Sequence, residues 1–244
     1  MAELAIIFVA LAIGGLAKGA TGAGAPLLAI PAMAAVFDVS FAIAMMLVSN
    51  IVTNAWQVWH YREHRPEDRF LWKFVGGGVG GAIVGTLLLT ALPSDALMAA
   101  LGVSVVFYIL LKLFNPHFAL SEQAGDRIAL PAGLVSGLLQ GATGISAPAS
   151  ITFLNALRLK RPTFIFTISL LFVTFTAAQA VILAYAGIVT PQRLLLSAFA
   201  VLPILAFMPV GNWLCRRMPD HLFDRLILVL LAMLAVRLVF DAVT

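Results

Sequence analysis

The sequence predicts an all-α membrane protein, a polytopic helix bundle, and three observations lead to this fold class. Of its 244 residues, 62% are hydrophobic and only 11% are charged, whereas a soluble domain carries about 25% charged residues to cover its surface. Several apolar runs are about 20 residues long, which is the length that a helix needs to cross a bilayer. A glycine-rich motif also occurs twice in the chain.

Six segments have the length and composition of ordinary spanning helices. They are residues 41–59, 71–92, 95–114, 163–186, 191–214 and 221–243. The apolar segment 1–17 could be mistaken for a signal peptide, but it contains Glu3 and no lysine or arginine. Because a signal peptide begins with a basic stretch, we interpret it as the first membrane segment.

Two further apolar segments, residues 4–37 and 128–157, are each too long for one ordinary span. Glycine, threonine and proline interrupt them at residues 19–26 and 141–148. We expect each to form two short helices joined by an unwound turn, either as a re-entrant hairpin or as a broken crossing. Irregular backbone at membrane depth is tolerated only inside protein or beside a wet cavity, so these breaks are the first place to look for function.

The two breaks carry the repeated motif. Residues 15–26 align without gaps on residues 137–148, and eight of the twelve positions are identical at an offset of 122. This predicts a single membrane domain made of a first repeat (1–115), a linker loop (116–127) and a second repeat (128–244).

Loop charge indicates how the two repeats are oriented, since lysine and arginine favour the cytoplasmic side of a membrane. The loop at Asp38 has no basic residue, whereas its repeat partner holds Arg158, Lys160 and Arg161. In the second pair, the loop 62–73 holds four basic residues and its partner near Pro191 only Arg193. In the third, the turn at Ser94 has none and its partner holds Arg216 and Arg217. This alternation is typical of inverted-topology repeats. We therefore expect two inverted repeats, each with a broken or re-entrant helix pair plus three spanning helices, and both termini outside.

The breaks also have the composition of an anion site. Glycine permits tight backbone conformations, and Pro26 and Pro148 suit the first turn of a following helix, whose N–H groups and dipole attract anions. The predicted ligands are Lys18, Gly19, Thr21, Gly22 and Gly24 in the first break, and Gln140, Gly141, Thr143, Gly144 and Ser146 in the second. The alternative is that these small residues only allow close helix packing, which is also our interpretation of the glycines at 77, 81 and 85.

Lys18 lies deep in an apolar segment, directly at the first break, and its repeat partner is the neutral Gln140. A lysine at membrane depth is costly and marks a substrate path or a counter-charge. The alternative is that its chain reaches back to the interface.

Neutral amides form a polar stripe on one predicted helix. Asn50, Asn54 and Gln57 share a face at positions i, i+4 and i+7, and Gln179 occupies the position in the second repeat that matches Gln57. These four side chains either complete the binding pocket or hydrogen-bond neighbouring helices.

Other chemistry is not visible in the sequence. All acidic residues and histidines fall in predicted loops or at helix ends, and no zinc spacing, nucleophile motif or phosphate loop occurs. The single cysteine, Cys215, supports neither a disulfide nor a metal site. We therefore expect no catalytic residue, no metal, no cofactor and no nucleic-acid partner.

With these motifs, the chain resembles the sulfite exporter TauE/SafE family of membrane transporters over nearly its whole length. The resemblance rests on the glycines and the proline of the two breaks, although Ser146 stands where the first copy has Gly24. It implies transport of sulfite, sulfonates or related organosulfur acids.

Our hypothesis is a secondary transporter or exporter of small anions, working by alternating access in a bacterial inner membrane. Its partners would be the anion and the lipid bilayer, and a homodimer is compatible with the sequence. The alternatives are a non-transporting membrane subunit of a larger complex, which would tolerate changes at the breaks, and a membrane-embedded enzyme.

Overall fold

The computed structural model describes residues 2–66, 69–114, 119–217 and 220–243, and within these ranges it contains helices and turns but no strand. The helices are α1 (Ala2–Thr21), α2 (Ala25–Ala34), α3 (Val39–His60), the short 3-10 helix η1 (Arg62–His64), α4 (Arg69–Ala91), α5 (Ser94–Phe114), α6 (Glu122–Thr143), α7 (Ala147–Ala156), α8 (Arg161–Tyr185), α9 (Pro191–Phe199), α10 (Val201–Arg217) and α11 (Asp220–Val243). The prediction of an all-α membrane bundle is confirmed.

Within the described ranges, five segments are long and apolar enough to cross a bilayer. They are Val39–His60, Arg69–Ala91, Ser94–Phe114, Arg161–Tyr185 and Pro191–Cys215. Much of their outer surface is apolar and exposed, for example at Val103 and Leu202 (64% and 63% exposed). Such a surface requires lipid around it, so the chain is a multi-pass membrane protein.

Both predicted breaks are present. Helix α1 ends at Thr21 and α2 begins at Ala25, while α6 ends at Thr143 and α7 begins at Ala147. The backbone turns at Gly22 (φ 82°) and Gly144 (φ 74°), in the left-handed region that glycine adopts without strain. The helices before the breaks are longer than the predicted short ones, since α1 has 20 residues and α6 has 22.

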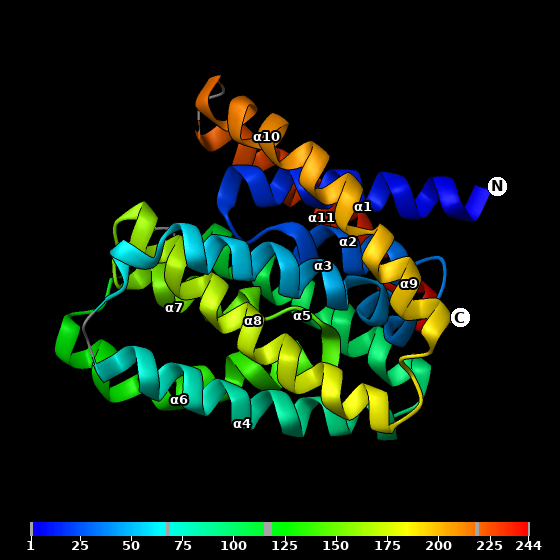
Figure 1. Cartoon of the computed structure of the whole chain (residues 1–244), viewed down its shortest axis with the longest axis horizontal. Coiled ribbons are helices and arrows are strands. Elements are labelled where there is room, and N and C mark those ends of the chain that lie inside the picture. Colours follow the sequence, from blue (N-terminus) through cyan, green and yellow to red (C-terminus); the bar gives the residue numbers. More distant parts are fainter. Residues whose placement is uncertain (1, 67–68, 115–118, 218–219, 244) are drawn as a thin grey trace.

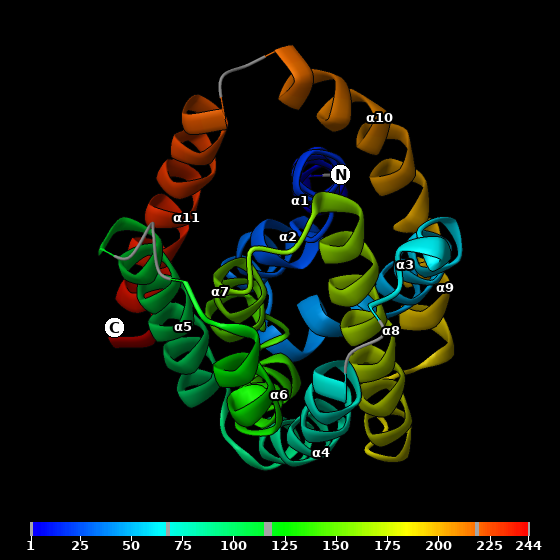
Figure 2. The same cartoon turned by 90° about the vertical axis from the view of Figure 1, so that its left-hand side faces the viewer.

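The helices pack in exchanged pairs. Helix α4 packs along α6, and α1 packs along α10, while α3 lies against α8 and α5 against α11. Figure 2 shows α4 and α6 side by side at the lower edge, with α10 and α11 at the upper edge. Each pair therefore joins a helix of the predicted first repeat to one of the second. The inverted orientation of the repeats across a membrane stays a prediction.

Glycines allow the closest of these approaches. A Cβ added at Gly81 or Gly85 of α4 would overlap carbonyl oxygens of α6, and one added at Gly137 of α6 would overlap a carbonyl oxygen of α4. The two backbones are therefore in direct contact, which side chains of any size would prevent. The packing predicted for the glycines at 77, 81 and 85 is confirmed.

The span predicted at 191–214 is present as Pro191–Cys215, but two predicted elements differ in detail. The span 191–214 is divided at Ala200 into α9 and α10, because the ring nitrogen of Pro203 cannot donate a hydrogen bond to the carbonyl of Phe199. The linker predicted to run to residue 127 is already helical from Glu122. There the hydroxyl of Ser121 accepts a hydrogen bond from the backbone N–H of Ala124 (3.3 Å) and caps α6.

All four tryptophans of the chain lie towards one end of the bundle, near the end of α3, the start of α4 and the end of α10 (Figure 1). They are Trp56, Trp59, Trp72 and Trp213, and each is about half exposed. The guanidinium carbons of Arg62, Arg65 and Arg217 lie 5.0, 5.0 and 4.3 Å from the ring centroids of Trp59, Trp72 and Trp213. Tryptophan and arginine together are typical of a membrane interface, so we call this the basic end.

Candidate functional site

The side chain of Lys18 is completely buried in the last turn of α1. Its Nζ donates a hydrogen bond of 2.7 Å to Oδ1 of Asn54 on α3, and the amide nitrogen of Asn54 donates to the backbone oxygen of Asn50 (2.7 Å). Among the described residues, no carboxylate lies within 4 Å of this ammonium. This burial contradicts the alternative in which the side chain of Lys18 reaches back to the interface. In the part of the chain that the structure describes, its positive charge has only a neutral amide as hydrogen-bond partner.

A cavity of about 470 Å³ begins at Lys18 and extends to the helix ends at the basic end. Its polar wall combines the amide of Gln57 with Tyr61, Arg161 and Asn212. Its other lining residues are Gly19, Gly22, Val52, Trp56, Ile165, Leu205, Met208 and Pro209. The cavity therefore has a cation at its inner end, a second cation at its mouth and neutral hydrogen-bonding groups between them.

Arg161, which in the sequence stands out only as part of a basic loop, also lines this cavity. It is the first residue of α8, and its Nη2 donates a hydrogen bond to the carbonyl oxygen of Ala20 (3.2 Å), in the last turn of α1. No local pattern could have indicated this, because the two residues are 141 positions apart. Only the packing of the second predicted repeat against the first places Arg161 beside Lys18.

The two threonines of the breaks have the same environment. Thr21 Oγ1 donates to the carbonyl of Ala17 (2.8 Å) and accepts from the N–H of Ala23 (3.3 Å). Thr143 Oγ1 donates to the carbonyl of Leu139 (2.8 Å) and accepts from the N–H of Ile145 (3.3 Å). Both hydroxyl protons are thus engaged with the backbone, and both threonines stabilise the end of one helix and the turn that follows.

The remaining predicted residues of the breaks are divided between packing and the N-cap positions. A Cβ at Gly19 would overlap the carbonyl of Met208 on α10, and one at Gly141 would overlap α4. Gly24 and Ser146 occupy the N-cap positions of α2 and α7, and the Ser146 hydroxyl oxygen accepts a hydrogen bond from Ser150 (3.0 Å). The packing alternative therefore holds for Gly19 and Gly141.

Among the described residues, the two breaks do not line the cavity at Lys18 together, as a single shared pocket would require. An added Cβ at Gly22 would lie 2.9 Å from Ile165 near the start of α8, whereas one at Gly144 would lie 2.8 Å from Ile43 near the start of α3. Helices α3 and α8 run in opposite directions (Figure 1), so these two starts are at opposite ends of the bundle. Of the two breaks, only the first lines the cavity at Lys18.

The amide stripe on α3 is divided in the same way. Gln57 lines the cavity, and its Oε1 accepts a hydrogen bond from the hydroxyl of Ser169 on α8 (3.1 Å). Gln179 points to the end of α6, where its Nε2 donates to the carbonyls of Gln140 (3.2 Å) and Gly141 (3.0 Å). The predicted interhelical role of the amides is therefore present at Gln57 and Gln179, beside the contact of Gln57 with the cavity.

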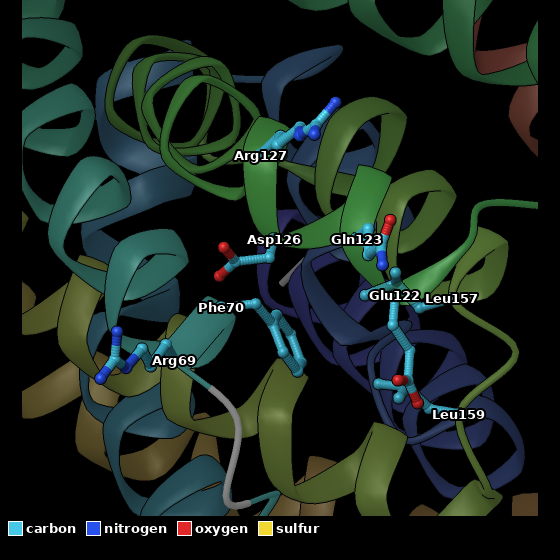
Figure 3. Close-up of a pocket in the computed structure, with 8 residues that line it drawn as sticks. All are labelled: Arg69, Phe70, Glu122, Gln123, Asp126, Arg127, Leu157 and Leu159. Carbon is cyan, nitrogen blue, oxygen red and sulfur yellow. The ribbon is translucent and has the colours of Figure 1, made fainter.

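A second cavity, of about 440 Å³, lies at the starts of α4 and α6. Figure 3 shows the carboxylates of Asp126 and Glu122 on different sides of the Phe70 ring, with Arg69 and Arg127 farther out. Asp126 also forms an ion pair with Lys73. With two carboxylates in its wall and no residue of the breaks, this cavity is poorly suited to an anion.

The model of a family described as "Sulfite exporter TauE/SafE" matches residues 6–238, which is nearly the whole chain. Searches of curated proteins and of solved structures gave no match.

Proposed function

Because the chain belongs to the sulfite exporter TauE/SafE family, we propose that it is a secondary transporter of small sulfur-containing anions such as sulfite or sulfonates. The family is one of transporters and not of enzymes, which agrees with the membrane-spanning helices of the fold. The proposed site is the cavity at Lys18, and the proposed location is a bacterial inner membrane.

One observation carries this proposal, namely the buried ammonium of Lys18 with a neutral amide as its hydrogen-bond partner. A charge taken out of water costs several kcal/mol unless an opposite charge is near. Bound sulfite or sulfonate would supply that opposite charge. The Lys18 ammonium, which destabilises the protein when no ligand is bound, would then form favourable, charge-assisted hydrogen bonds with the anion.

The shape of the cavity supports a route from the basic end. Arg161 at the mouth attracts anions by its charge, and the amide of Gln57 and the side chain of Asn212 offer hydrogen bonds along the wall. A mouth of one charge sign raises the local concentration of the oppositely charged ligand. Because basic loops face the cytoplasm, the cavity would receive its anion from the cell interior.

Alternating access is supported by the exchanged contacts of the two halves. Gly22 meets Ile165 at one end, and Gly144 meets Ile43 at the other, and both pairs combine residues that are equivalent under the offset of 122. A molecule built from two such halves can open at either end by repeating one local rearrangement. We propose that rocking of the helices around Lys18 closes the basic end and opens the opposite one.

The membrane potential gives this process a driving force. An inside-negative potential contributes about 2.3 kcal/mol per 100 mV to expelling one negative charge. Export of the anion alone therefore needs no relay of buried carboxylates. An anion that moves together with one monovalent cation carries no net charge, so this driving force applies only to uncoupled export.

Binding measurements on purified protein test this proposal. Sulfite, thiosulfate, a short sulfonate, sulfate and chloride would be titrated against the wild type, Lys18→Ala and the control Lys160→Ala, which removes an exposed lysine next to Arg161. We expect saturable binding of a sulfur oxyanion that is at least about tenfold weaker in Lys18→Ala, as loss of a charged hydrogen bond implies. Equal binding by Lys18→Ala would contradict the site, and the absence of any anion binding would favour the non-transporting subunit.

A further inference from the structure

Three uncharged, buried side-chain oxygen atoms have no hydrogen-bond partner among the described residues. They are Oδ1 of Asn50 on α3, Oε1 of Gln140 on α6 and Oγ1 of Thr176 on α8. The three side chains are only 3%, 2% and 1% exposed. Because an unpaired buried polar group costs about 1–3 kcal/mol, three such atoms in one region indicate a binding partner that is positively charged or donates hydrogen bonds.

The helix register brings Asn50 and Thr176 together. Helices α3 and α8 pack against each other in opposite directions, and the hydrogen bond between Gln57 and Ser169 fixes their register. Asn50 lies seven residues before Gln57, and Thr176 lies seven residues after Ser169. Seven residues are close to two helical turns, so Asn50 and Thr176 lie level with each other and face the same interface.

Gln140 joins this pair from α6. Its backbone carbonyl accepts a hydrogen bond from Gln179, which lies one turn beyond Thr176 on α8. Gln140 also lies in the last turn of α6, where the helix dipole places partial negative charge. The region therefore combines three unpaired oxygens with the negative end of a helix, and all of these features favour a cation.

The first half of the molecule shows what such a cation does. Lys18 and Gln140 are equivalent under the offset of 122 residues, and so are Asn54 and Thr176. In the first half, the ammonium of Lys18 lies at the end of α1 and is bound to Asn54. In the second half, Gln140 is neutral, so the equivalent place at the end of α6 has no covalently attached charge.

We propose that a sodium ion binds between Asn50, Gln140 and Thr176, where it replaces in the second half the ammonium that Lys18 provides in the first. Amide, hydroxyl and carbonyl oxygens are the ligands that hard cations prefer, and sodium sites in transporters are built from such neutral oxygens at the ends of broken helices. With no carboxylate among the three ligands, a monovalent ion fits better than a divalent one.

The sodium ion and the anion would bind cooperatively, and this part rests on the proposed function. Asn50 lies one turn before Asn54, the partner of Lys18, so the sodium ion and the ammonium repel each other. An anion bound to Lys18 cancels this repulsion and strengthens sodium binding. By reciprocity, sodium strengthens anion binding by the same factor, for which we expect about five-fold or more.

Thermal unfolding of the purified protein tests sodium binding without an anion substrate. The melting temperature would be measured as choline is replaced by Na⁺ or K⁺ at constant ionic strength, with a counter-ion that the protein does not bind. A ligand that binds only the folded state raises the melting temperature as its concentration rises. We expect a rise of several degrees with Na⁺, and a smaller one with K⁺.

Three variants locate the effect. Thr176→Val removes the hydroxyl with little change in shape and is expected to abolish the sodium response. Gln140→Lys supplies a tethered ammonium, as Lys18 does, and is expected to make the melting temperature independent of Na⁺. Thr167→Val is the control, because Thr167 is also buried on α8 but its hydroxyl already donates to the carbonyl of Thr163 (2.8 Å), so this variant should respond like the wild type.

The outcomes separate this proposal from the proposed function. A wild type that does not respond to Na⁺, or a Gln140→Lys variant that still responds, would overturn the sodium site even if Thr176→Val fails to fold. Anion binding at Lys18 is measured separately, so a sodium response without anion binding would overturn the transport proposal and leave the sodium site in place. Anion binding that does not change with Na⁺ would overturn only the cooperativity.

Discussion

The ammonium nitrogen of Lys18 lies 2.7 Å from the amide oxygen of Asn54, and both side chains are fully buried. In water-soluble and membrane proteins alike, a buried cation is usually paired with a carboxylate. Here the partner is neutral, which leaves the charge uncompensated until an anion binds. This arrangement lowers the stability of the unliganded protein and raises its affinity for an anion. It leads to two predictions about stability.

Replacing Lys18 by methionine should make the unliganded protein more stable. The change keeps the approximate length of the side chain and removes a buried charge that has no opposite charge beside it. Replacing even paired buried charges by apolar residues is often neutral or stabilising by about 1–4 kcal/mol. The melting temperature of Lys18→Met should therefore be equal to or higher than that of the wild type. A clear decrease would mean that Lys18 serves packing, and not ligand binding.

Replacing Asn54 by leucine should have the opposite effect. The ammonium would lose its hydrogen-bond partner while remaining buried, which costs about 3–5 kcal/mol. The double variant Lys18→Met/Asn54→Leu removes both groups and should recover most of the lost stability. Denaturation of the four proteins forms a double-mutant cycle. Additive effects in this cycle would contradict the proposed interaction between the two side chains.

The glycines of α4 offer a matched pair of substitutions. Gly81→Ala places a methyl group against the backbone of α6 and should destabilise the protein by about 1–3 kcal/mol. Gly80→Ala places the same group in open space on the same helix, so it should be neutral or stabilise by up to about 1 kcal/mol, since alanine favours the helix. Thermal unfolding compares the two variants. Equal melting temperatures would show that α4 and α6 are not packed through their backbones.

Arg161 should affect anion binding more than stability, although its replacement also removes the hydrogen bond to the carbonyl of Ala20. Arg161→Gln removes the charge at the mouth of the cavity and should slow anion association and weaken binding, most clearly at low ionic strength. The adjacent substitution Lys160→Gln also removes one positive charge but leaves the cavity unaltered, so this variant should bind the anion nearly as the wild type does. Association rates at two salt concentrations distinguish the variants. The same loss in both would indicate a general surface effect.

The fold could be predicted from the sequence largely because lipid imposes simple rules. Apolar runs of spanning length became helices, and the glycine-threonine motifs became breaks at Gly22 and Gly144. The turn at Ala200 was not predicted, because hydropathy does not report backbone hydrogen bonds. Pro203 removes one such bond without making the segment less apolar.

The candidate site could be predicted only in part, because local sequence does not show where helices from distant parts of the chain meet. The position of Lys18 in an apolar segment left two outcomes open, burial or a side chain that reaches the interface, and the packing of the helices decides for burial. Three further features depend on how α1, α3 and α8 pack. They are the contact of Lys18 with Asn54, the position of Arg161 at the end of α1, and the separation of the two breaks. The repeated motif correctly indicated two special turns, but it could not show that they lie at opposite ends.

The most direct test of the account is sulfite flux into or out of liposomes that contain the purified protein, compared between the wild type and Lys18→Met. We expect wild-type flux that saturates with sulfite and a decrease of at least about tenfold in Lys18→Met, although this variant is at least as stable as the wild type. Flux in Lys18→Met that equals the wild-type flux would contradict the claim that the buried ammonium is the binding partner of the transported anion.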